Sequence, residues 1–150
     1  MLDSKPGCDI LISNPPYISS KAFRTTTSRS VRHFEPKIAL VPPLSRDTEG
    51  QMDDGDVFYP HLLALADQLD AKVVLFEVAD MAQATRVVTL MARSQHPWDR
   101  FAIWKDEPTQ AGPVPDAAVT IGEKQVRIRG AGHGRSVFAY RGIGGAWVGM

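Results

Sequence analysis

Four consecutive residues, Asn14-Pro15-Pro16-Tyr17, combine groups that suit one kind of chemistry. Asn14 offers a side-chain carbonyl and Pro15 a backbone carbonyl as hydrogen-bond acceptors, while Tyr17 offers a ring face that can cover a planar group. These groups suit the methylation of a flat NH2 group, whose delocalised lone pair makes it a poor nucleophile. Two acceptors that hold both N–H bonds favour a pyramidal nitrogen, and positioning of this kind is worth about 7–11 kcal/mol of a barrier.

The segment before these residues must position them. Residues 9–13 are mostly apolar and predict a short buried strand, which the two prolines end because neither can donate to a ladder. The asparagine and the ring are therefore expected at the carboxyl end of a strand, where open α/β sheets bind ligands. Asn-Pro-Pro can also form a simple turn, since the residue before proline is extended and Asn favours turns. The tyrosine and the strand pattern favour the site over the turn.

Length and composition exclude several classes of protein. The chain has 150 residues, 43% hydrophobic and 23% charged, as expected for one globular domain. Lys plus Arg equals Asp plus Glu at 17 each, which disfavours a sequence-independent nucleic-acid binder. The one cysteine, Cys8, excludes an internal disulfide and a Cys-rich zinc site, and we expect no metal. No stretch is long and apolar enough to span a membrane, and the first residues lack signal-peptide or transit-peptide features.

Two helices and a second strand follow in an alternating order. Residues 72–78 form a near-continuous apolar run, typical of a central parallel strand covered on both faces. Asp80 and Gln83 have the capping-box spacing before the second helix. The apolar stripe of the first helix is predicted from Phe58, Leu62, Leu65, Ala66 and Leu69, and that of the second from Met81, Ala84, Val87, Val88 and Met91. Strand, helix, strand, helix predicts an α/β, doubly wound sheet.

The last third of the chain has a different pattern. Short β-type runs at residues 98–104, 117–121, 125–129 and 136–140 predict an antiparallel end to the sheet, with a hairpin that turns near Gly122-Glu123. Residues 130–134 are glycine-rich, but no following helix supports a phosphate loop, so we expect a glycine turn. Residues 142–149 are expected to be a loose terminus.

Two polar segments are expected to be loops. Residues 18–32 predict a surface loop, at most with a short helix, and Arg24, Arg29, Arg32 and His33 make it locally basic. This face is either simply solvated or contacts an acidic or phosphate-bearing partner. Residues 41–56 form a second, unusually long loop, whose last residue, Asp56, is expected to cap the helix that follows.

Several motifs together resemble one family. The segment Asp9-Ile-Leu-Ile-Ser-Asn-Pro-Pro-Tyr-Ile18, followed by Phe34-Glu-Pro-x-x-Ala-Leu40, resembles the HemK-like release-factor glutamine methyltransferases. Further similar segments are Asp54-Gly55 with Phe58-Tyr59, Phe76-Glu77 with Gln83, and Gly134-Arg135-Ser-Val137. The NPPY motif alone is shared with enzymes that methylate amino groups of DNA and RNA. The other segments point to the glutamine-methylating branch.

The resemblance implies a Rossmann-like class I fold that binds S-adenosylmethionine and methylates the glutamine of a Gly-Gly-Gln loop in peptide-chain release factors. Asn14 and Pro15 would accept the glutamine amide protons, Pro16 would complete the motif, and Tyr17 would pack on the amide plane. Asn14 would also border the cofactor. Glu35 would either brace the substrate side of this loop or be an ordinary exposed carboxylate.

Two further residues have open roles in this comparison. Glu77 would order the site or serve as the partner of an arginine. Gln83 is explained as a helix cap, and we assign it no chemistry.

The chain also departs from the family. It lacks the glycine-rich loop after the first strand and the acidic residues that hold the cofactor, so we interpret residues 1–150 as the C-terminal half of a methyltransferase domain, with 105–133 as an insertion that contains a hairpin. Its first strand would then be left as a sheet edge with an uncovered apolar face. We expect the chain alone to bind S-adenosylmethionine weakly or not at all.

Two other functions remain open at this point. The chain could be a segment of an N6-adenine methyltransferase acting on DNA or RNA, although the charge balance makes a nucleic-acid partner the weaker reading, or a non-catalytic remnant. The sequence does not reveal the compartment, and the cytoplasm and, in a eukaryote, the mitochondrion are both open.

Overall fold

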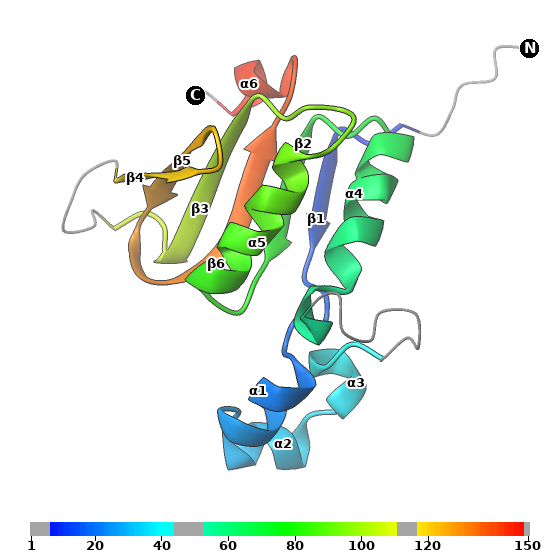
Figure 1. The fold of residues 1–150 in the computed structure, drawn as a ribbon, viewed down its shortest axis with the longest axis vertical. Helices are drawn as coiled ribbons and strands as arrows, with labels where there is room; N and C mark the ends of the chain where they lie inside the picture. Colours follow the sequence, from blue (N-terminus) through cyan, green and yellow to red (C-terminus); the bar gives the residue numbers. More distant parts are fainter. Residues whose placement is uncertain (1–6, 44–52, 111–116, 149–150) are drawn as a thin grey trace, which may run out of the picture.

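Six strands form one mixed sheet in the computed structural model, which describes residues 7–43, 53–110 and 117–148 (Figure 1). The strands are β1 (Ile10–Ser13), β2 (Val73–Glu77), β3 (Arg100–Glu107), β4 (Ala118–Ile121), β5 (Lys124–Arg129) and β6 (Ala131–Tyr140). Their order across the sheet is β1-β2-β6-β3-β5-β4. The predicted α/β class and the predicted strands after residues 9 and 72 are confirmed.

The strand directions show where the predicted antiparallel ending holds. β1 and β2 are parallel, as expected, and β6 lies between β2 and β3 and is antiparallel to both. The hairpin of β4 and β5 turns at Gly122, whose φ of 60° suits glycine, as the sequence predicted. However, β5 pairs with β3 in the parallel direction, so the outer part of the sheet is mixed and not simply antiparallel.

Two helices cover one face of the sheet. These are α4 (Phe58–Gln68) and α5 (Met81–Ala92), and their buried side chains form the main core with alternate residues of the strands, among them Val74, Phe76 and Val137. The predicted stripe of α5 is confirmed, apart from half-buried Met81. The predicted stripe of α4 is confirmed in part, because Ala66 is buried and Leu62 packs against the core. Tyr59 and Leu63 are buried as well, which the sequence did not predict, while Leu65 is exposed. Tyr59 determines the phase of α4 by donating its hydroxyl to the carbonyl of Glu77 (2.8 Å).

Three short helices replace the loop expected after the NPPY motif. They are α1 (Ser20–Thr25), α2 (Arg29–Phe34) and α3 (Lys37–Leu40), and they project beyond the carboxyl end of β1 (Figure 1). The side chains of Ser19 and Ser28 cap the first two by accepting from the amides of Ala22 and Val31. We call residues 18–43 the arm.

The C-terminal part differs from expectation in two places. Gly130 and Gly132 both have a φ of 90°, but only Gly130 lies outside a strand, because β6 begins at Ala131 and includes the other residues of the glycine-rich run. The expected loose terminus contains α6 (Gly144–Trp147), which packs closely on the sheet. A β-carbon at Gly144 would lie 2.5 Å from the carbonyl oxygen of Lys72, so this contact requires glycine.

Some predictions concern residues outside the described part: those on residues 1–6, on most of the loop at 41–56, and on residues 111–116 of the predicted insertion. Among the described helices, none is both long and apolar enough to cross a membrane. Within the same residues, no three His, Cys, Asp or Glu side chains are grouped so that they could hold a metal ion.

Strand β1 forms one edge of the sheet within the described residues, since it pairs only with β2. Ile12 on this strand is 68% exposed and Ile10 is 51% exposed. Both lie on the face opposite to the helices. The expectation of an edge strand with an uncovered apolar face agrees with this arrangement.

Candidate functional site

The strand register brings residues from four neighbouring strands into one row. Glu77 at the end of β2 pairs with Ser136 of β6, which in turn pairs with Trp104 of β3. Asn14 follows Ser13, the partner of Phe76, and so comes level with Glu77. These side chains share the sheet face opposite to α4 and α5. The row therefore lies at the carboxyl ends of β1, β2 and β3, as predicted for Asn14.

A cavity of about 580 Å³ opens over this row. Its apolar floor comes from Ile12, Leu75 and Trp104, and the Trp104 ring stacks on Phe138 with a centroid distance of 5.0 Å. Its polar wall includes Asn14, Glu77, Ser136 and the pair formed by Asp106 and Arg135. A cavity of this size suits one small ligand or one inserted side chain, and its polar and charged lining favours a polar one.

Tyr17 and Glu77 are joined at the rim of this cavity. The Tyr17 hydroxyl donates to Oε1 of Glu77 over 2.7 Å, which fixes the ring over the end of β2. Burial raises the pKa of Tyr17 to about 12, and the hydrogen bond to Glu77 adds to this effect. Glu77 therefore orders the site, one of its two expected roles. Arg135 is not its partner, because Arg135 donates to Asp106 (2.6 Å) and this bond raises the pKa of Arg135.

The other predicted site residues differ in whether they line the cavity. Asn14 is exposed at the cavity wall, and its side chain has no hydrogen bond to any other described residue. Pro15 is buried and Pro16 half-buried, and neither lines the cavity. Glu35 ends α2 on the exposed surface and accepts no hydrogen bond on its side chain from described residues, so it does not brace the loop by direct contact. Its charge still reaches Tyr17 and slightly raises the pKa of that residue.

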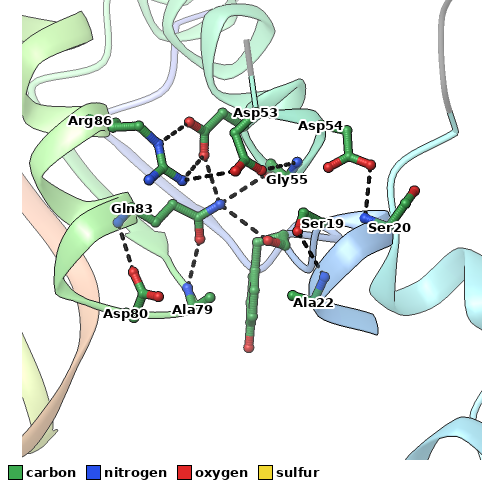
Figure 2. A network of polar contacts seen from close by, with 12 residues as sticks. Ser19, Ser20, Ala22, Asp53, Asp54, Gly55, Ala79, Asp80, Gln83 and Arg86 are labelled. Carbon is green, nitrogen blue, oxygen red and sulfur yellow. Dashed lines mark hydrogen bonds and ion pairs between the residues drawn. The ribbon is translucent and has the colours of Figure 1, made fainter. Parts of the chain in front are cut away.

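Gln83, to which the sequence assigned only a capping role, is the centre of a buried network (Figure 2). It is 2% exposed, and its side-chain NH2 donates to the carbonyls of Tyr17 (3.1 Å) and Gly55 (3.1 Å) and to Oδ1 of Asp56 (2.9 Å). Its Oε1 accepts from the amide of Ala79 (2.7 Å). The side chain thus ties the NPPY loop to the start of α5.

Asp56 extends this network and does not cap α4 as expected. The residue ends a 3-10 turn, η2 (Asp54–Asp56), and its carboxylate takes two hydrogen bonds from Arg86 at 2.5 and 3.0 Å. The bond to this buried carboxylate raises the pKa of Arg86. The residue before it must be Gly55, because a β-carbon there would lie 2.6 Å from the carbonyl oxygen of Tyr17.

Sequence reasoning missed Gln83, Asp56 and Arg86 as site-supporting residues. One signal was present: Gln83 is a polar residue beside the apolar stripe of its helix, and buried polar side chains normally have partners. The partners themselves lie 27 to 66 residues away in the sequence, so local patterns do not identify them.

The link between Tyr17 and Glu77 gives a prediction for alkaline pH. Because the folded-state pKa of Tyr17 is raised from 10.0 to about 12, the stability it contributes is present below pH 10 and lost between pH 10 and 12. In Glu77→Gln the carboxylate is gone, and the Tyr17 phenol is expected to ionise at a lower pH than in the wild type. Ultraviolet absorbance titration measures this shift, with Tyr17→Phe identifying the Tyr17 component. An unchanged midpoint would show that Glu77 does not hold this hydroxyl.

Comparisons with family models, with curated proteins and with solved structures found no match for this chain.

The described residues fit only part of an S-adenosylmethionine site. Asn14 is free to border the methyl donor, and the cavity is open beside it. The described turns that lead from the carboxyl ends of β1 and β2 to the next helix contain no glycine, whereas the adenosyl part of such a cofactor needs a close backbone approach. The chemistry considered below is therefore limited to what this chain does with an acceptor NH2 group.

Proposed function

We propose that this chain forms the acceptor side of an S-adenosylmethionine-dependent protein methyltransferase, and that its substrate is the glutamine of a Gly-Gly-Gln loop in a peptide-chain release factor. One observation supports this more than any other. The carboxamide of Asn14 has no partner in the described part, and it lies level with the Tyr17–Glu77 pair beside a cavity at the carboxyl edge of the sheet.

The topology supports the finer fold assignment within this proposal. Parallel β1 and β2, the helices after each of them, and the antiparallel β6 inserted between β2 and β3 occur in the order expected for the C-terminal half of a class I methyltransferase. The unpaired edge of β1 in the described part agrees with a sheet that has a further strand beside it. The outer β4–β5 hairpin would be the added segment.

In the proposed mechanism the chain positions a poor nucleophile. The Asn14 side-chain carbonyl accepts one N–H of the glutamine carboxamide. The resemblance assigns the second N–H to the backbone carbonyl of Pro15, a buried residue that does not line the cavity in this structure. The Tyr17 ring lies over the carboxamide plane. It is held there by the hydrogen bond from the Tyr17 hydroxyl to Glu77 and by the hydrogen bond from the Gln83 side chain to the Tyr17 backbone carbonyl. S-adenosylmethionine supplies the methyl group. The nitrogen proton becomes acidic once the methyl is attached, so no strong base is required.

A methyl-transfer experiment tests the proposed function. A polypeptide that joins this chain to a cofactor-binding half is incubated with labelled S-adenosylmethionine and a release factor, or with the same factor carrying Glu in place of the loop Gln. Label is expected on the first protein only, at the loop glutamine. Equal labelling of both factors, or label on neither, would refute the proposed substrate.

The second candidate is an N6-adenine methyltransferase, because the same acceptors suit an adenine amine and the arm is basic. Adenine-containing DNA and RNA oligonucleotides in the same assay separate the two. The nucleic-acid reading predicts label on adenine and binding that weakens steeply as salt is raised. The protein reading predicts no label on adenine.

Substitutions of Tyr17 separate the role of the ring from that of the hydroxyl. Tyr17→Phe loses the bond to Glu77, worth about 1 kcal/mol, but keeps the ring face. Tyr17→Ala also loses the ring, and glutamine-peptide binding is therefore expected to fall several-fold further than in Tyr17→Phe. Calorimetric titration with a Gly-Gly-Gln peptide measures both variants. Equal losses would contradict packing of the ring on the substrate.

A further inference from the structure

The arm, residues 18–43, exposes two large apolar side chains. Phe34, at the end of α2, is 82% exposed, and Ile38, in α3, is 71% exposed. They are the two most exposed large apolar side chains of the described residues. Helices this short normally bury such side chains, because packing supplies most of their stability. These side chains offer apolar area on the arm that another molecule could cover.

The arm is also strongly basic, although the whole chain is neutral. It contains five cationic residues, Lys21, Arg24, Arg29, Arg32 and Lys37, and one carboxylate, Glu35, so its formal charge is +4. Arg29 is exposed and its side chain has no hydrogen bond or ion pair within the described part. A partner that covers Phe34 and Ile38 must therefore bring acidic groups to the same surface.

The arm follows directly after Tyr17 of the cavity lining and is fixed to neighbouring residues by hydrogen bonds. The amide of Ile18, next to Tyr17, donates to the carbonyl of Leu40 (2.9 Å), and the amide of Ser20 donates to Oδ2 of Asp54 (2.8 Å). The charge of Glu35, which follows Phe34, is felt at the Tyr17 hydroxyl. Figure 1 shows the arm beyond the carboxyl end of β1, at the end of the sheet where the cavity lies. A polypeptide whose side chain enters the cavity thus lies beside this surface.

We propose that the arm is the docking surface for the substrate protein, which it recognises through an acidic segment with an apolar side chain near the modified residue. This inference rests on the proposed function. Exposed aromatic and arginine side chains are the types that anchor protein interfaces. A nucleic acid is the less suitable partner, because an exposed aliphatic Ile38 offers no stacking surface to a base.

The experiment compares a large and a small probe with the 150-residue chain. The probes are an intact release factor and a short acetylated Gly-Gly-Gln peptide, with fluorescence anisotropy as the measure of affinity. The variants are Phe34→Ser and Arg29→Glu, both at exposed positions where folding is little affected. Matched controls are Ile143→Ser, 59% exposed near α6 at the opposite end of the sheet, and Arg127→Glu on β5.

Each arm variant is expected to weaken binding of the intact factor by about tenfold or more and to leave peptide affinity within about twofold. The controls should bind both probes like the wild type. If the factor binds the arm variants as tightly as the wild type, or binds the wild type no better than the peptide does, the docking proposal fails while the proposed function stands. If neither probe binds the wild type, both fail. Tight, salt-sensitive binding of a single-stranded RNA that Arg29→Glu abolishes would identify the arm as a nucleic-acid surface and overturn the proposal.

Discussion

Replacing Asn14 by alanine is expected to lower the turnover number for glutamine methylation by about a hundredfold or more, in a polypeptide that joins this chain to a cofactor-binding half. Removal of one hydrogen-bonding group that acts on the reacting atoms typically has an effect of this size. Affinity for S-adenosylmethionine is expected to change little, because Asn14 serves mainly the acceptor nitrogen. Single-turnover kinetics and calorimetric titration of the cofactor measure the two quantities separately.

A matched control for this variant is Gln125→Ala, which removes another carboxamide from an exposed strand position outside this cavity. It should leave turnover unchanged. An Asn14→Ala enzyme with wild-type turnover would exclude Asn14 from the mechanism. A variant that loses cofactor affinity instead would assign Asn14 to the cofactor.

Gln83→Leu is expected to reduce the free energy of unfolding by about 3 kcal/mol, although the side chain does not line the cavity. Leucine fills a similar volume but leaves the Tyr17 and Gly55 carbonyls, one Asp56 oxygen and the Ala79 amide without this partner. The buried carboxylate of Asp56 would then be stabilised by its ion pair with Arg86 alone among these contacts. Urea denaturation measures the loss.

The control for Gln83 is the same substitution at an exposed site. Gln125→Leu breaks one hydrogen bond, to the Thr120 hydroxyl, and should change stability by about 0.5 kcal/mol or less. Because Gln83 also holds the NPPY loop, its variant should bind the Gly-Gly-Gln peptide more weakly at temperatures where it remains folded. Wild-type stability in Gln83→Leu would contradict the network.

Local patterns were sufficient for the elements that carry the site. The apolar runs before Asn14 and around residues 72–78 predicted β1 and β2, although the helices cover only one face of β1 and leave Ile10 and Ile12 exposed on the other. The two prolines then placed Asn14 at the carboxyl edge. The cap at Asp80 and the stripe of α5 predicted that helix for the same local reason.

Long-range contacts could not be predicted in the same way. Asp56 has a cap-like position but pairs with Arg86, 30 residues later, because a buried carboxylate is stabilised more by a two-fold bond to a guanidinium than by one amide. The phase of α4 depends on the bond from Tyr59 to the carbonyl of Glu77. The row of Glu77, Ser136 and Trp104 depends on strand register, which no local pattern specifies.

The short helices of the arm were missed for a different reason. Their caps, Ser19 and Ser28, are visible in the sequence, but the helices bury no residue, so the apolar periodicity that normally indicates a helix is absent. The exposure of Phe34 explains both this failure and the proposed role of the arm. A short helix whose apolar side chain is exposed to a partner lacks the apolar stripe by which a helix is predicted from sequence.

The most direct test of the account uses the fact that Asn14 is the only asparagine in the chain. Labelling with ¹⁵N-asparagine gives nuclear magnetic resonance signals from one side-chain NH2 and one amide, both from the proposed acceptor residue. Titration with a Gly-Gly-Gln peptide is expected to shift the side-chain signals, while a Gly-Gly-Glu peptide, which has no NH2 group in its side chain, should not. Asn14 signals that stay unchanged with the glutamine peptide, or that shift equally with both, would contradict the claim that this carboxamide holds the methyl acceptor.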